Sequence, residues 1–124
     1  MLQFTIQEKK AIMSLLYDMA GVDGKVSSRE SQLLDLLKVK WNLSLSDVLQ
    51  AKKMTPPIVA STIRNMNESK RLFASQLLAS MQIIDEDVSY SEEMLYDMLV
   101  TSCNLPHNFV YRAALLALDK FLTE

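Results

Sequence analysis

Apolar side chains recur every three or four residues along most of this chain, the spacing that places them on one face of an α-helix. In the first predicted helix, Ile12, Leu15, Leu16 and Met19 share such a face. No segment shows the strict alternation of a β-strand, and glycine and proline are few. The pattern therefore predicts an all-α protein, a compact bundle of six or seven helices. The expected apolar faces of later helices contain Leu33, Leu34, Leu37 and Trp41; Ile58, Val59, Thr62, Ile63 and Met66; Phe73, Leu77, Met81 and Ile84; and Met94, Leu95, Met98 and Leu99.

Polar residues mark where several of these helices should begin. Three segments have the form of a capping box, in which a hydroxyl side chain and a glutamate three residues later bind each other's backbone N–H groups. They are Thr5–Glu8, Ser27–Glu30 and Ser89–Glu92. Other expected helix caps are Ser44 or Ser46, before a short helix from about 45 to 52; Thr55, before Pro56 and Pro57; and Asn67.

The segment from about 107 to 122 differs from the others because it is apolar nearly all round. A helix without a polar face usually lies at the centre of its domain. We therefore expect this C-terminal segment to form a central helix around which the others pack.

The chain also contains a degenerate internal repeat without gaps. Leu15 and Leu16 match Leu77 and Leu78 in constant register, and the match continues to Asn42 and Asn104. Such self-similarity predicts two copies of one structural unit. We expect two pseudo-symmetric helix–acidic loop–helix repeats, about 11–44 and 73–106, packed face to face. Connecting helices at about 45–66 would join them within one domain spanning residues 1–124.

Composition narrows the class of protein. The chain has 124 residues, 49% of them hydrophobic, and a formal net charge of −2, so a whole-chain attraction to nucleic acid is not expected. The single Cys103 excludes an intramolecular disulfide and fits a reducing compartment. No apolar run approaches the roughly 20 residues that span a bilayer, and residues 1–10 lack a signal-peptide pattern. These features predict a cytoplasmic protein without direct membrane insertion.

Each repeat contains an acidic loop of the form Asp-x-x-Val-Ser-x-x-Glu. The first loop resembles the second half of a calcium-binding EF-hand loop, but Met19 and Gly21 stand where the first oxygen ligands would be. One loop therefore offers too few oxygens for a hard cation. If the two loops approach each other, they supply a candidate site for calcium or magnesium. Its tentative ligands are Asp23, Glu30, Asp85 and Glu92. The alternative is that these residues only start helices and complement the helix dipole.

Charge is distributed unevenly along the chain. No lysine or arginine occurs between Arg71 and Arg112, an interval that contains six acidic residues. One end of the molecule should therefore be acidic and could dock a basic protein surface. The candidate partner-binding residues are Glu86, Asp87 and Glu93.

Other chemistry has weaker support. Cys103 and His107 would supply only two of the three or four protein ligands that zinc needs. The methionines mostly have core spacing, and Met54 and Met66 are the two that we expect at an adaptable groove for a partner helix.

Around the acidic loops the sequence resembles the tellurite-resistance TerB-like family, which includes the N-terminal region of membrane-anchored DnaJ-like co-chaperones. The family motif is Asp-Gly-x-Val/Ile-x-x-x-Glu followed by an amphipathic helix, with a degenerate second copy. Residues 23–30 match it, and residues 85–92 match apart from Glu86 in place of glycine. The resemblance implies a pseudo-symmetric all-helical domain without enzymatic activity, acting in stress responses, phage defence or membrane-associated complexes. It also implies that Asp23, Glu30, Asp85 and Glu92 are metal ligands.

Three functions are therefore weighed. The first is a non-enzymatic TerB-like binding or scaffold module of a bacterial stress response, with a divalent cation at the acidic loops. The second is a metal-independent protein-interaction module with an acidic docking face, and the third is a small metal-dependent hydrolase. The sequence leaves self-association open and identifies no partner.

Overall fold

Six helices form the described part of the chain. The computed structural model describes residues 3–21, 26–83, 90–106, 120 and 122–123, and among them there is no strand. The all-α prediction is therefore confirmed, whereas the expected central helix at 107–122 lies almost entirely outside the described residues. The helices are α1 (Ile6–Gly21), α2 (Ser28–Lys40), α3 (Leu45–Lys53), α4 (Pro56–Arg64), α5 (Glu68–Ile83) and α6 (Tyr90–Ser102).

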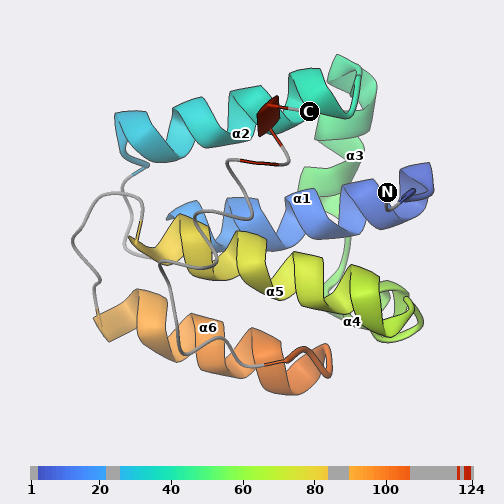
Figure 1. Cartoon of the computed structure of the whole chain (residues 1–124), viewed down its shortest axis with the longest axis vertical. Helices are drawn as coiled ribbons and strands as arrows, with labels where there is room; N and C mark the ends of the chain where they lie inside the picture. The colour runs from blue at the N-terminus through green and yellow to red at the C-terminus, as the bar shows by residue number, and fades with distance from the viewer. Residues whose placement is uncertain (1–2, 22–25, 84–89, 107–119, 121, 124) are drawn as a thin grey trace.

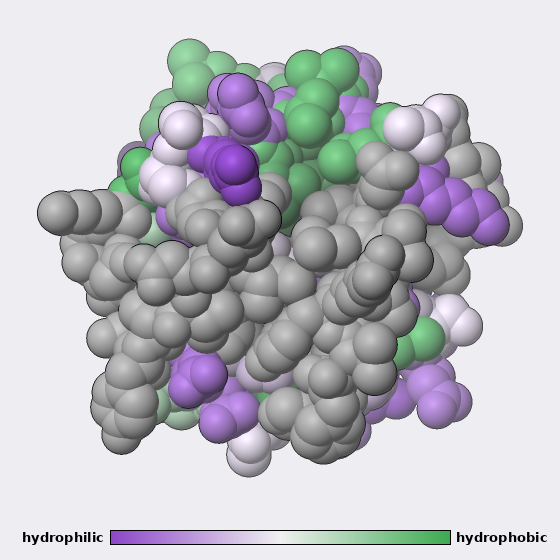
Figure 2. All heavy atoms as spheres, turned by 60° about the vertical axis from the view of Figure 1, so that its left-hand side comes forward, coloured by the Kyte–Doolittle hydropathy of each residue, from purple (hydrophilic) through white to green (hydrophobic). Residues whose placement is uncertain are grey.

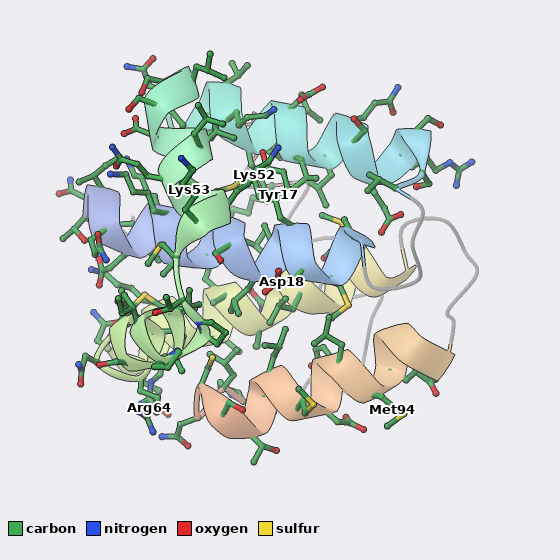
Figure 3. The ribbon with its side chains drawn as sticks, turned by 180° about the vertical axis from the view of Figure 1, so that it is seen from behind. Tyr17, Asp18, Lys52, Lys53, Arg64 and Met94 are labelled. Carbon is green, nitrogen blue, oxygen red and sulfur yellow. The ribbon has the colours of Figure 1, made fainter. Side chains whose placement is uncertain are left out.

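The helices are arranged around a central pair. α1 and α5 lie side by side and run in the same direction, with α2 outside α1 and α6 outside α5 (Figure 1). α3 and α4 pack against α1, which contacts every other helix of the described structure. α2 and α6 consequently form two opposite edges of the bundle, as the view from behind also shows (Figure 3).

The helix boundaries follow the internal repeat. α1 begins at residue 6 and α5 at residue 68, a shift of 62, and both contain 16 residues. α2 begins at residue 28 and α6 at residue 90, the same shift of 62, and both contain 13 residues. The repeat in the sequence is therefore a repeat of helix pairs in space.

Side-chain caps fix several helix starts. The Thr5–Glu8 and Ser27–Glu30 capping boxes form as predicted, and Asn67 Oδ1 accepts a hydrogen bond from Lys70 N at 2.9 Å. Ser44, rather than Ser46, caps α3, and Asp47 completes a capping box that the sequence analysis did not name. Thr55 occupies the cap position of α4, but its side chain makes no capping hydrogen bond.

The core lies between α1, α2 and α5. The predicted apolar faces of these helices are buried, including Leu16 on α1, Leu37 on α2 and Leu77 on α5. The rings of Phe4, Trp41 and Phe73 pack together at one end, with Phe4 and Phe73 centroids 5.4 Å apart. No helix of the described residues is long and apolar enough to cross a membrane.

Candidate functional site

The two acidic loops join helix ends that lie at one end of the bundle. α1 and α5 both end there, and α2 and α6 both begin there (Figure 1). Asp23, Asp85, Glu86 and Asp87 lie outside the described residues, and so does the side chain of Glu92. The grouping of the four proposed metal ligands therefore stays a prediction.

Glu30 is the one proposed ligand whose side chain is described. It is only 5% exposed, and its Oε1 accepts a hydrogen bond from Ser27 N at 3.0 Å. In return, Ser27 Oγ accepts one from Glu30 N at 3.1 Å. This geometry gives Glu30 a structural role at the start of α2, which favours the capping interpretation for this residue. Within the described ranges, no group of three or more His, Cys, Asp or Glu residues is placed to hold a metal ion.

Glu93 is the one proposed partner-binding residue whose side chain is described, and it is exposed on α6. Asp97 follows one turn later and is also exposed. Beside this acidic stripe runs an apolar one, since Met94 is 53% and Met98 61% exposed. Residues four apart share one face of a helix. We define the α6 outer face as Glu93, Met94, Asp97 and Met98.

The exposure of Met94 and Met98 corrects the sequence analysis, which placed both on the buried side of their helix. The buried residues of α6 are instead Tyr96 and Val100, with Leu95 and Leu99 half-buried beside them. Figure 3 shows Met94 pointing away from the neighbouring helices.

The methionines expected at a groove are placed differently as well. Met66 is buried and Met54 is partly buried against the core, so neither opens a groove. On α4, Ile58 was also expected to be buried, but it is 51% exposed. The spacing of Tyr96, Val100 and Cys103, four and then three residues apart, was the signal for the true buried face of α6.

The α6 outer face has properties of a docking surface. Unbranched methionine side chains adapt to different partner shapes, and exposed methionines are common at protein-binding surfaces. α6 contains no lysine or arginine that could balance Glu93 and Asp97 from within the helix. Like charges four residues apart weaken a helix by roughly 0.2–0.5 kcal/mol. A basic partner would relieve this repulsion.

Two other groups on the molecule do not add up to a reactive site. Burial raises the pKa of the Cys103 thiol although the charge of Arg64 opposes it, so the thiol stays protonated near neutral pH. Partial burial raises the pKa of Asp18, whose side chain lies on α1 (Figure 3). Near Asp18, the Lys52 ammonium lies 4.7 Å from the centre of the Tyr17 ring, a cation–π contact that ties α3 to α1.

Comparison with known proteins supports the fold and leaves function open. No family model matches the sequence, and no match was found among curated proteins. The structure is similar to the crystal structure of a protein of unknown function, PG1108 from Porphyromonas gingivalis W83. The TM-score is 0.78 at 18% sequence identity, over 97% of this chain and 99% of that chain. A likeness at this identity shows a shared helical fold only.

Proposed function

We propose that the chain is a non-enzymatic helical binding module whose α6 outer face docks another protein. The observation that carries the proposal is the pairing of an exposed methionine stripe, Met94 and Met98, with an acidic stripe, Glu93 and Asp97. The apolar stripe would supply most of the binding free energy, and the acidic stripe would orient a basic partner and speed its association.

The helix is suited to this task by its anchoring. Tyr96 is 1% exposed and holds α6 on the bundle together with Val100 and Cys103. A rigidly held helix face loses little conformational entropy when it binds. The partner would therefore meet a preformed ridge, in the mode by which one helix face packs against another.

The resemblance to the TerB-like family suggests the setting in which such a module works. We propose a scaffold role in a bacterial stress response, in keeping with the non-enzymatic character that the resemblance implies. Neither the partner nor a connection to tellurite follows from the site itself.

Site-specific photocrosslinking would test the proposal. A benzophenone amino acid at Met98 should give a discrete adduct in an extract of the organism that encodes the chain. The same label at exposed Ser61 on α4 provides the matched control. The Met98 adduct should weaken when the salt concentration is raised, because exposed charge pairs are screened. Equal labelling from both positions, or no adduct from Met98, would overturn the proposal.

A second candidate function is divalent-cation binding at the acidic loops. It is favoured by one observation, that the helix ends flanking both loops lie at the same end of the bundle (Figure 1). Asp23, Asp85 and Glu92 would supply its carboxylates, and calcium or magnesium would suit all-oxygen ligands. Its test is the effect of cations on thermal unfolding, described in the Discussion.

A further inference from the structure

The edge of the bundle opposite α6 also exposes an apolar helix face. On α2, Leu36 is 53% and Val39 80% exposed, although both belong to a helix that packs on the core through Leu33 and Leu37. In Figure 2, hydrophobic side chains reach the surface along the top of the molecule, which α2 and α3 form in Figure 1. Exposed apolar side chains that gather on one face mark interaction sites.

The charges beside this second face are positive. Arg29, Leu36 and Lys40 are spaced seven and four residues apart, so they follow one stripe of α2, with Val39 one turn from Leu36. We define the α2 outer face as Arg29, Leu36, Val39 and Lys40. It is an apolar ridge beside basic residues, where the α6 outer face is an apolar ridge beside acidic residues.

The two faces also correspond through the repeat. With the shift of 62 residues between α2 and α6, Leu36 matches Met98 and Lys40 matches Ser102. The two edges therefore share their backbone geometry and their exposed apolar positions but differ in charge. Because they lie on opposite sides of the bundle, they cannot pair within one molecule (Figure 1).

We propose that the partner of the α6 outer face is a second copy of this chain, which docks through its α2 outer face. Met94 and Met98 of one copy would pack against Leu36 and Val39 of the next, while Glu93 and Asp97 approach Arg29 and Lys40. Each copy keeps one unused face of each kind, so the contact is head-to-tail and can propagate into a ring or a filament. The inference rests on the proposed function and adds the identity of the partner.

The contact should be weak in solution. One helix face against another buries less area than the roughly 1,200 Å² of a stable interface, so we expect dissociation constants between about 1 µM and about 1 mM. Sedimentation velocity of the full chain should show the mean mass rising above 14.1 kDa with concentration. The rise should shrink near about 1 M salt, where the screening length falls to about 3 Å.

Two variants separate this arrangement from a symmetric dimer. Met98→Lys breaks the α6 outer face and leaves the α2 outer face intact, whereas Val39→Glu does the reverse. Each variant alone should stay at the monomer mass, and an equimolar mixture should form at least a one-to-one complex. Ile58→Lys and Ile58→Glu, on the half-exposed Ile58 of α4, are charge-matched controls that should associate like the wild type.

Several results would overturn self-docking. They are a wild-type mass that stays monomeric up to about 1 mM, a mixture that does not associate, or association that survives both variants. The proposed function fails separately. A Met98 photoadduct with the mass of two copies supports self-docking, and an adduct with another protein overturns self-docking while leaving α6 as the docking face.

Discussion

Asn42 and Asn104 occupy equivalent places at the ends of α2 and α6, and both have left-handed backbone, with φ of 52° and 53°. The next residue closes the helix in the same way each time. Leu43 N donates to Lys38 O and Leu105 N donates to Val100 O, both at 2.9 Å. Asparagine tolerates this conformation better than other residues except glycine. The two halves of the repeat therefore end their second helix with the same motif.

Substitutions of these two asparagines should have parallel effects. Asn42→Ala and Asn104→Ala should each lower the free energy of unfolding by about 1 kcal/mol, because a Cβ branch disfavours positive φ. Asn42→Gly and Asn104→Gly should be neutral or slightly stabilising. Urea unfolding followed by circular dichroism would measure both pairs. If alanine and glycine behave alike at either position, the left-handed backbone is not what makes asparagine suitable there.

Glu8 and Lys70 connect the starts of the two central helices, with Lys70 Nζ 2.8 Å from Glu8 Oε1. Partial burial would raise the pKa of Glu8. The hydrogen bonds from Lys70 and Thr5, together with the charge of Lys70, outweigh this effect and lower the pKa below its ordinary value of 4.5. Because the folded state then holds its proton less tightly than the unfolded state, the pair stabilises the protein above pH 4.5. That stability is lost as the pH falls through the folded pKa.

Glu8→Gln should therefore lower the free energy of unfolding at neutral pH by about 1 kcal/mol. It should also flatten the loss of stability below pH 4.5 relative to the wild type. Urea unfolding at a series of acidic pH values provides the measurement. Glu68→Gln, which removes an exposed carboxylate near the same end of α5, serves as the control. A Glu8→Gln profile parallel to that of the wild type would contradict the linkage.

The capping role of Glu30 predicts a loss of stability that does not depend on metal. Glu30→Gln and Ser27→Ala should each cost about 1 kcal/mol, with or without EDTA, because each removes one side of the capping box. Thermal unfolding in both conditions would measure this. A loss seen only in the presence of a cation would instead identify Glu30 as a ligand.

The same assay separates the two candidate functions. If protein docking alone is correct, calcium, magnesium, manganese and zinc should leave the unfolding midpoint of the wild type unchanged. A cation at a hundred times its dissociation constant would add about 2.7 kcal/mol, a readily detected shift. A rise that disappears in Asp23→Asn and Asp85→Asn would establish the cation site.

The orientation of α6 predicts unequal effects along one helix. Tyr96→Ala should cost about 3–5 kcal/mol, since it empties a fully buried position in the core. Met98→Ala should change stability by less than about 0.5 kcal/mol, because its side chain is exposed. Denaturant unfolding of dilute protein would compare them. A large cost for Met98→Ala under these conditions would place its side chain in the core after all.

Much of the local structure follows from the sequence alone. Helix starts are set by short-range hydrogen bonds, so Thr5 with Glu8 and Ser27 with Glu30 were recognisable before any tertiary contact was known. The repeat in sequence likewise anticipated helix pairs at constant shift. Both are local or symmetric properties, which do not depend on how distant segments pack.

The orientation of α6 was decided only by tertiary structure. Its apolar residues, from Met94 to Val100, surround so much of the helix that spacing permits more than one buried face. Contact with α5 and α1 selects Tyr96 and Val100 for burial and leaves Met94 and Met98 exposed. The sequence by itself determined that two acidic helix–loop–helix units would form. Only the packing of α1 beside α5 placed α2 and α6 on opposite edges, because the side chains that fill that contact come from distant parts of the chain.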